Sequence, residues 1–144
     1  MKAKNEFRMT VDSRSVNEAF VRSAVAAFSA QLDPTIEEIA DIKTAVSEAV
    51  TNCIVHAYAE SLGKIYIYSA IFDDGRIKIS IRDKGCGIED IKKAREPLFT
   101  TLGGERAGLG FAVMESFTDK LTVRSTKGKG TTVTMIKKIG GREA

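Results

Sequence analysis

The sequence has few of the residues that build metal centres and disulfide frameworks. It contains two cysteines and one histidine. Cys53 and Cys86 lie far apart and lack the CxxC spacing of a zinc site. The pattern therefore excludes zinc-ribbon and disulfide-rich proteins, and we treat both cysteines as thiols.

Long apolar runs are also absent. No stretch reaches the roughly 18 apolar residues that a membrane helix needs. The first residues, MKAKNEFRMTVDSR, contain no apolar segment of the kind that directs export. We therefore expect neither a signal peptide nor a membrane span, and we expect a cytoplasmic protein. With two prolines and 43% hydrophobic residues, the composition is typical of one globular domain over residues 1–144.

The charge is modest and evenly distributed. The 22 Lys and Arg residues stand against 19 Asp and Glu residues, which gives a net charge of +3. Because the basic residues are spread along the chain, the sequence carries no clear footprint for direct nucleic-acid binding. An anionic ligand is compatible with this balance.

The spacing of apolar residues predicts a strand and two helices in the first part of the chain. Residues 6–11 alternate as a half-buried strand does. Ser15 and Glu18 have the spacing of a capping box at the start of a helix. The apolar stripe expected for this helix is Val16, Phe20, Ala24, Ala27 and Phe28.

The second helix has two candidate starts. One is Asp33 with Pro34 at the first helical position, and the other is Thr35 with Glu38. From either start we expect the helix to run to about Tyr58. Its expected apolar stripe is Ile39, Ile42, Val46, Ala49, Cys53 and Ala57.

The second part of the chain reads mainly as strands. Residues 64–72 and 76–82 form a hairpin around an Asp-Asp-Gly turn. Residues 83–110 are loop-like, with at most a short helix at 90–95, and we expect a lid at about 90–110. A helix at 109–117 and strands at 120–126 and 131–138 follow. The fold class is α+β, a two-layer sandwich with helices on one face of a mostly antiparallel mixed sheet.

Three polar residues share one ridge of the second helix. Glu48, Asn52 and His56 follow one another at four-residue intervals beside the apolar stripe. By spacing alone they are most simply a solvated helix edge. Glu48 and Asn52 are nevertheless only about 6 Å apart along the axis, so both can face one ion or one reacting oxygen. His56 is a turn further on, and we expect a helix-end or packing role for it.

Two glycine motifs follow the helix. Asp83, Gly85 and Gly87 form a DxGxG motif directly after a strand, which indicates either a tight turn or a backbone that approaches a flat ligand closely. Residues 103–110, rich in glycine and leading into a helix, suit a phosphate-binding loop or a mobile lid, and they are equally compatible with a plain flexible loop. Neither the Rossmann fingerprint nor the P-loop spacing occurs.

The ordered set of these motifs indicates a protein family more specifically than any single motif does. The Glu-xxx-Asn helix, the DxGxG turn, the glycine-rich segment ending in GLG and the Gly-Thr-Thr strand resemble the GHKL (Bergerat) ATP-binding fold over about residues 6–138. The segments QLDP, SEAVTN, PLFTT and MESF resemble the anti-sigma serine kinases of that superfamily, and its sporulation members most of all. Glu48 stands where histidine kinases usually have asparagine, and no helical hairpin remains to carry a phosphoacceptor histidine.

The resemblance implies a role for each matching position. Asp83 would accept the adenine amino group of ATP or ADP, Asn52 would hold Mg²⁺, and Glu48 would be the catalytic base. Glycines shape the pocket and phosphate loop, either of two threonines backs the adenine, and two arginines match positions used for partners. These residues are Gly85, Gly87, Gly108, Gly110, Thr131, Thr132, Arg22 and Arg106.

The resemblance also implies a function. It is that of an anti-sigma factor and protein serine kinase, a homodimer that binds a sigma factor of the sigma F type and keeps it from RNA polymerase. The kinase would phosphorylate a serine of an anti-anti-sigma factor, a STAS-domain protein. Three alternatives stay open from the residues themselves: a general stress anti-sigma kinase, a nucleotide-gated binding module without kinase activity, and an interaction domain without a nucleotide.

Overall fold

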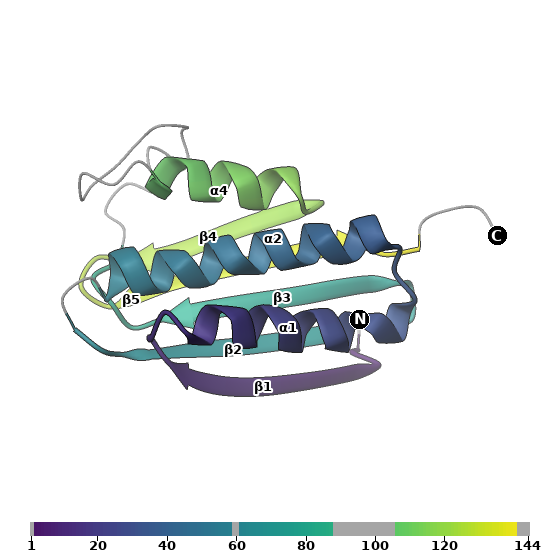
Figure 1. Cartoon of the computed structure of the whole chain (residues 1–144), viewed down its shortest axis with the longest axis horizontal. Helices are drawn as coiled ribbons and strands as arrows, with labels where there is room; N and C mark the ends of the chain where they lie inside the picture. Colours follow the sequence, from purple (N-terminus) through teal and green to yellow (C-terminus); the bar gives the residue numbers. More distant parts are fainter. Residues whose placement is uncertain (1, 59–60, 88–105, 141–144) are drawn as a thin grey trace.

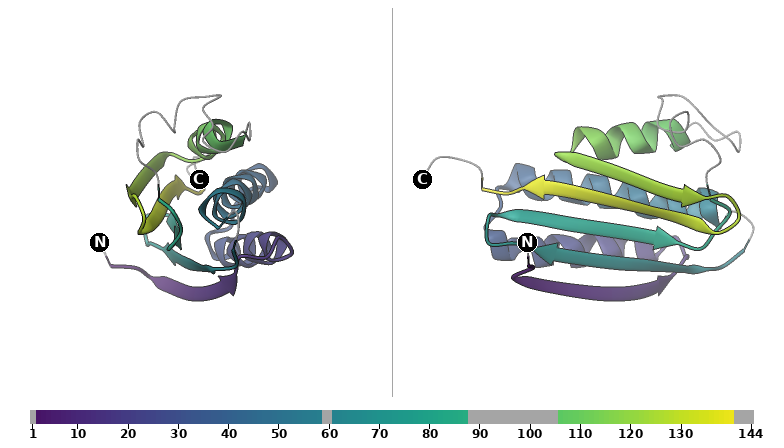
Figure 2. Two further views of the ribbon diagram at one scale, coloured as in Figure 1. Left: turned by 90° about the vertical axis from the view of Figure 1, so that its left-hand side faces the viewer. Right: turned by 180° about the vertical axis from the view of Figure 1, so that it is seen from behind.

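The chain forms two layers, a five-stranded sheet and a layer of helices that covers one of its faces (Figures 1 and 2). The computed structural model describes residues 2–58, 61–87 and 106–140. The elements in chain order are β1 (Asn5–Asp12), α1 (Asn17–Ser29), a 3₁₀ turn (Ala30–Leu32), α2 (Ile36–Asn52), a π-turn (Cys53–Ala57), β2 (Lys64–Ile71), β3 (Arg76–Asp83), α4 (Arg106–Ser116), β4 (Lys120–Thr126) and β5 (Gly130–Lys138). The α+β prediction with helices on one face is confirmed.

The sheet has the strand order β1-β2-β3-β5-β4, and every one of these pairings is antiparallel. The expected mixed sheet is therefore wrong in one respect, since no parallel pair occurs among the described strands. Alternate residues of β2 and β3 turn towards the helices, and isoleucines fill most of these positions. The predicted hairpin between these strands is confirmed, and Gly75 has the positive φ of 87° that its turn needs.

Helix α2 is the central helix, and its start was one of two predicted alternatives. The Thr35 hydroxyl accepts a hydrogen bond from the Glu38 backbone N–H at 3.0 Å, and the Glu38 carboxylate accepts one from the Thr35 N–H at 2.9 Å. This capping box confirms the start at Thr35 over the start at Asp33. The helical path continues to Ala57, but its last residues, Cys53–Ala57, are a π-turn.

The predictions for helix α1 are wrong in two respects. No side chain caps its start, and Glu18 instead accepts a hydrogen bond from the Ser47 hydroxyl of α2. The predicted apolar stripe is also rotated from the buried one, since Val16 is 75% exposed and Phe20 is 56% exposed. The buried side chains of α1 are Val21, Val25, Ala26 and Ser29. The helix has many small apolar residues, so two faces satisfy the helical period, and packing against α2 selects the valine face.

The remaining elements follow the predicted order. Helix α4 begins at Arg106, three residues before the predicted 109, and it packs against α2 through Phe111 and Met114. Strands β4 and β5 match the predicted 120–126 and 131–138 closely. The short helix expected at 90–95, and most of the lid expected at about 90–110, lie outside the described residues. Among the described helices, none has the length and apolar character to cross a membrane.

Candidate functional site

The site begins with two polar side chains on α2. Glu48 and Asn52 are both half-buried, one turn apart on the side of α2 that faces α4. A methyl group added at Gly110 of α4 would lie 3.1 Å from both side-chain amide atoms of Asn52 and 3.4 Å from Glu48 Oε2. The structure thus brings Glu48 and Asn52 of the polar ridge next to Gly110 of the second glycine motif.

Asn52 is poorly satisfied by the protein around it. Its side-chain oxygen and nitrogen are both buried, and neither has a hydrogen-bond partner among the described residues. A buried polar group left in this state costs about 1–3 kcal/mol, so such groups call for a ligand or water. An amide oxygen is a suitable ligand for Mg²⁺. The environment of Asn52 therefore fits the predicted metal-ligand role.

A site built on Asn52 would need further ligands from outside the protein. Among the described residues, no group of three or more His, Cys, Asp or Glu side chains is arranged to hold a metal ion. Mg²⁺ in nucleotide enzymes commonly uses one or two protein ligands together with phosphate oxygens and water. The single amide of Asn52, beside Glu48, matches this sparse type of metal site.

Asp83 forms the second part of the site, at the end of β3. Its side chain is only 6% exposed. Oδ1 accepts hydrogen bonds from the backbone N–H groups of Gly85 at 3.0 Å and Thr131 at 3.2 Å. The Cys53 thiol donates to Oδ2 at 3.6 Å. Burial raises the pKa of the Asp83 carboxyl, and the donated hydrogen bonds offset only part of that rise.

A buried carboxylate held by backbone donors is a selective acceptor. Oδ1 is occupied by two backbone donors, whereas Oδ2 has only the weak thiol donor. Oδ2 is thus able to accept a stronger donor, such as the amino group of a purine. The geometry fits the predicted adenine-binding role of Asp83.

Close backbone approaches explain the glycines around Asp83. A Cβ atom at Gly85 would lie 2.4 Å from the Ala57 carbonyl oxygen of the π-turn. A Cβ atom at Gly87, where φ is +75°, would lie 2.3 Å from the Thr126 carbonyl oxygen. Any side chain at either position would therefore displace the backbone. The DxGxG motif packs between the end of α2 and the β4–β5 turn.

Gly130 belongs to the same cradle, although the sequence reasoning did not select it. Its φ is +122°, and a Cβ atom there would lie 2.2 Å from the Asp83 carbonyl oxygen. The signal was present in the Gly-Thr-Thr motif, whose glycine precedes the two threonines that were selected. Only the strand register, which places Gly130 and Thr131 beside Asp83, gives this glycine a role.

Tyr58, the residue that follows the π-turn, supports the loop after Asp83. The Tyr58 hydroxyl donates to the Lys64 carbonyl at 2.8 Å and accepts from the Lys84 N–H at 2.6 Å, which ties the residue after Asp83 to β2. Sequence reasoning missed Tyr58, because nothing in its spacing distinguishes it from a core tyrosine. His56 lies in the π-turn at the end of the helix, half-buried, where a helix-end histidine was expected.

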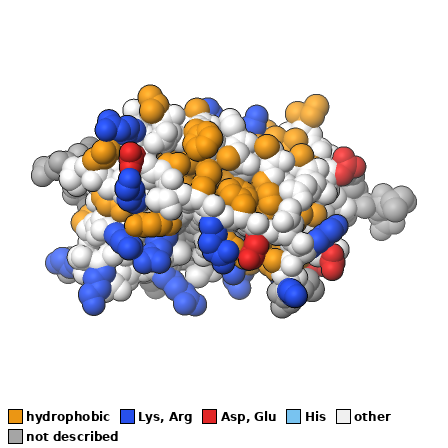
Figure 3. Space-filling view, turned by 90° about the horizontal axis from the view of Figure 1, so that it is seen from below, with side chains coloured by type: hydrophobic (Ala, Val, Ile, Leu, Met, Phe, Trp, Pro, Cys, Tyr) orange, Lys and Arg blue, Asp and Glu red, His pale blue; other side chains and the backbone are white. Residues whose placement is uncertain are grey.

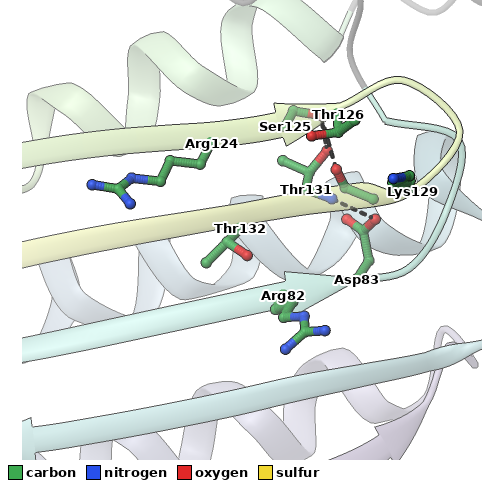
Figure 4. Close-up of a pocket in the computed structure, with 9 residues that line it drawn as sticks. Arg82, Asp83, Arg124, Ser125, Thr126, Lys129, Thr131 and Thr132 are labelled. Carbon is green, nitrogen blue, oxygen red and sulfur yellow. Dashed lines mark hydrogen bonds between the residues drawn. The ribbon is translucent and has the colours of Figure 1, made fainter.

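The structure separates the two candidate threonines. Thr131 is 9% exposed, its N–H binds Asp83, and its hydroxyl lies 2.8 Å from the Ser125 hydroxyl. Thr132 points to the opposite face of the sheet, where it is paired in register with Arg82 on one side and Arg124 on the other (Figure 4). Only Thr131 is beside the Asp83 carboxylate. The inclusion of Thr132 in the cofactor-binding set is therefore not supported by its position.

The predicted partner-binding arginines lie in different elements. Arg22 is on α1, with its guanidinium 3.5 Å from the Glu18 carboxylate and its side chain 40% exposed. Arg106 and Gly108 are in the first turn of α4, where the backbone is described and the side chains are not. Gly108 lies two residues before Gly110, about half a turn around the axis of α4.

Comparisons with known proteins agree with this geometry. Residues 10–137 match the family model described as the histidine kinase-like ATPase domain. An anti-sigma F factor of Caldanaerobacter subterraneus is 60% identical over 97% of this chain and 98% of its own length. The chain belongs to the anti-sigma F factor family. Other anti-sigma F factors include one of Geobacillus kaustophilus, 49% identical over 98% of this chain and 97% of its own length, and one of Clostridium perfringens, 52% identical over 94% of this chain and 97% of its own length.

Solved structures confirm the fold of this anti-sigma F family member. The RsbU and RsbW domains of a Mycobacterium tuberculosis protein match with a TM-score of 0.69 and 24% identity, over 94% of this chain and 33% of that one. The mycobacterial sensor histidine kinase MprB matches with a TM-score of 0.57 and 16% identity, over 91% of this chain and 97% of that one. The two-layer arrangement of helices on an antiparallel sheet is thus the histidine kinase-like ATPase fold.

Proposed function

We propose that this anti-sigma F family protein is an ATP-dependent protein serine kinase. In this proposal it binds a sigma factor of the sigma F type and phosphorylates a serine of an anti-anti-sigma partner, a STAS-domain protein. The proposal rests on one observation: Glu48 and Asn52, which are one turn apart on α2, lie beside Gly110 of α4. A carboxylate beside a magnesium ligand is the arrangement that a hydroxyl-activating phosphotransferase needs.

The nucleotide would be held from two ends. Asp83 would accept a hydrogen bond from the adenine amino group, with Thr131 beside it. The backbone N–H groups at the start of α4, around Gly108 and Gly110, would face the phosphates, where a helix N-terminus favours negative charge. Asn52 would hold Mg²⁺, which neutralises charge on the phosphate oxygens when it is bound.

Glu48 would carry the proton transfer. As the serine oxygen of the partner forms a bond to the terminal phosphorus, the bond from that phosphorus to the bridging oxygen breaks and ADP leaves. The serine proton passes to the Glu48 carboxylate, which is half-buried within reach of the Gly110 backbone. A positioned base of this kind contributes about 100- to 10,000-fold in rate.

The partner-binding role is proposed for α1. Arg22 lies on its α2 side, where it pairs with Glu18, and its guanidinium is partly exposed and able to bind a carboxylate of a partner. Val16 and Phe20 expose apolar surface on another side of the same helix. Apolar side chains also appear along the edge formed by β1 and α1 (Figure 3), where Phe7, Met9 and Phe28 are only partly buried. We further propose a homodimer that acts in the cytoplasm, where a sigma factor meets RNA polymerase.

The direct test is phosphate transfer from labelled ATP. The protein is incubated with Mg²⁺, labelled ATP and a candidate STAS-domain partner, and the labelled residue is mapped. Glu48→Gln should bind ATP and transfer phosphate about 100- to 10,000-fold more slowly. Glu37→Gln, in the exposed first turn of the same helix, is the matched control and should transfer at the normal rate.

Three outcomes would contradict parts of the proposal. Undiminished transfer by Glu48→Gln would remove the base assignment. If Mg-ATP binds while no serine of any partner becomes labelled, the protein is a nucleotide-gated binding module. If only a partner from the general stress system becomes labelled, the protein is a kinase as proposed, but it serves a general stress sigma factor and not one of the sigma F type.

A further inference from the structure

The face of the sheet that carries no helix is rich in basic side chains. Alternation along each strand turns one set of residues away from the helices. The charged members of this set are Glu6, Arg8, Asp12, Lys64, Arg76, Lys78, Arg82, Lys120, Arg124 and Lys138. Lys and Arg side chains gather along the lower rim of Figure 3, where the sheet side of the molecule comes into view. Two acidic residues thus stand among eight basic ones in the described strands.

Four of these basic residues form a group of their own. Arg8 pairs with Glu6 at 3.4 Å, Lys64 pairs with Asp12 at 2.5 Å and Arg76 pairs with Asp74 at 2.7 Å, so their charges are partly met within the fold. The Lys138 ammonium donates a hydrogen bond to the Asp74 carbonyl oxygen. Lys78, Arg82, Lys120 and Arg124 have no such ion pair among the described residues. We call these four residues the cationic sheet face.

The strand register arranges the cationic sheet face as a rectangle around β5. Arg82 and Arg124 flank Thr132, and Lys78 and Lys120 flank Ile136. Because strands lie about 4.8 Å apart and rise about 3.3 Å per residue, the rectangle measures about 10 Å across and about 13 Å along β5. Its floor is uncharged and small, with Ser80, Thr122 and Thr134 in register between the two basic pairs.

One end of the rectangle is hollowed. A cavity of about 210 Å³ lies at the strand ends (Figure 4). Arg82, Arg124, Lys129 and Thr132 line it on the basic side, and Asp83 and Thr131 of the candidate site also lie in its wall. Figure 4 shows the two arginine side chains extending from β3 and β4 on either side of Thr132. Arginine forks and threonine hydroxyls are both suitable donors for carboxylate oxygens.

We propose that the cationic sheet face is a docking surface for an acidic segment of a partner protein, which lies along β5 with carboxylates on both sides. Charge complementarity supports this occupant, since four basic side chains that have no ion pair within the described part of the chain surround a floor of hydroxyl groups. A segment about 10 Å wide, the width of one helix, fits between the two basic rows. The surface is separate from Glu48 and Asn52, and only its hollowed end borders Asp83, so the proposal does not depend on the proposed kinase function.

The aromatic residues of this face disfavour single-stranded nucleic acid as the occupant. Binding of that kind relies on bare rings on which bases stack. Here the Tyr68 ring is covered by Arg8 at 4.6 Å, and the Tyr66 ring is covered by Lys84 at 5.0 Å and Arg82 at 5.6 Å. Because cationic side chains already cover these ring faces, bases cannot stack on them. The face is therefore suited to a ligand that is recognised by its charge alone.

The test uses a labelled poly-glutamate peptide of about 10 residues, which spans about 15 Å as a helix and so matches the rectangle. Binding to the full chain is followed by fluorescence anisotropy at low and at physiological salt, and it should weaken as salt rises. Arg82→Glu with Arg124→Glu should weaken binding at least about tenfold, which corresponds to about 1.4 kcal/mol. The matched control is Arg14→Glu with Lys43→Glu, two exposed positions outside this face, and it should change the affinity less than about twofold.

A second pair and a second probe decide the remaining outcomes. Lys78→Gln with Lys120→Gln, at the other end of the rectangle, should also weaken binding, and thermal unfolding checks that each variant is folded. Equal losses in the arginine pair and the control pair would overturn the proposal, because net charge alone would then explain the binding. Tighter binding of a single-stranded oligonucleotide than of poly-glutamate, lost in the same variants, would overturn it in favour of nucleic acid.

Discussion

Asp83→Asn separates two effects of the Asp83 carboxylate, its cost to the stability of the fold and its role as a hydrogen-bond acceptor for adenine. The wild-type side chain is 6% exposed, and burial raises the pKa of its carboxyl. The substitution keeps the shape and keeps an oxygen that accepts from the Gly85 and Thr131 N–H groups, but it removes the negative charge. The fold should therefore gain stability at neutral pH while the site loses its acceptor for adenine.

The structure allows both changes to be sized. A hydrogen bond to a charged acceptor is worth about 1.5–3 kcal/mol, so ATP affinity should fall about 10- to 150-fold. Relief of a strained functional residue commonly yields about 1 kcal/mol of stability, and for a domain of this size that raises the Tm by about 3 °C. Isothermal titration with Mg-ATP measures the first effect, and calorimetric or urea unfolding without nucleotide measures the second.

The pH dependence of the stability difference has a definite sign. Because the folded-state pKa of Asp83 is raised, its carboxyl favours the fold below the unfolded pKa, and this contribution is lost as the pH rises through the folded pKa. The variant does not titrate at this position. The free energy of unfolding of Asp83→Asn should therefore equal that of the wild type in acid and should exceed it increasingly towards neutral pH.

Asp12→Asn is the matched control, because its carboxyl is perturbed in the opposite direction. A hydrogen bond from Lys64, together with the charge of that lysine, lowers the pKa of Asp12. That variant should be less stable than the wild type at neutral pH, and the difference should vanish as the pH falls. If Asp83→Asn follows the same trend as Asp12→Asn, the burial of the Asp83 carboxylate does not destabilise the fold and the reasoning is refuted.

Three further variants test other parts of the structure. Gly110→Ala should weaken Mg-ATP binding in a titration without unfolding the chain, since its methyl group would lie 3.1 Å from both amide atoms of Asn52; unchanged affinity would place the phosphates elsewhere. Thr131→Val should lower ATP affinity and Thr132→Val should not, because only Thr131 lies beside the Asp83 carboxylate, and equal effects would contradict this separation. Thr35→Ala removes the capping box of α2 and should cost about 1 kcal/mol in urea unfolding, whereas a loss near zero would mean that water replaces the cap.

Much of the fold and of the candidate site was predictable from the sequence, because it depends on the periodicity of apolar and polar residues within single strands and helices. The alternation of Ile77, Ile79 and Ile81 identifies a strand with one buried face, and the hairpin turn fixes its partner. The four-residue interval between Glu48 and Asn52 places both on one side of a helix whatever the tertiary structure is. These features need only neighbouring residues, so a single sequence contains them.

The errors fall where distant segments decide the outcome. Helix α1 has two faces with a helical period, and only its contact with α2 shows that Val21 and Val25 are the buried ones. Thr131 and Thr132 are adjacent in sequence, and only the register with β3 shows which of them faces Asp83. The π-turn after Asn52 also changes the angular spacing of later residues, so a regular helical projection cannot place His56.

The unfavourable features of the fold are concentrated around one place, and this concentration supports a binding site more strongly than any motif does. Asp83 is a buried carboxylate with a raised pKa, and both amide atoms of Asn52 are buried without a partner in the described part of the chain. The helical path that carries Asn52 ends in a π-turn, Gly130 has a positive φ beside Asp83, and Gly87 has a positive φ beside Thr126. Strain and unsatisfied groups persist in a native structure where a ligand relieves them. A nucleotide that donates to Asp83 and a magnesium ion at Asn52 would relieve two of these features at once, so saturating Mg-ATP should stabilise this domain more than the same concentration of ATP with a chelator.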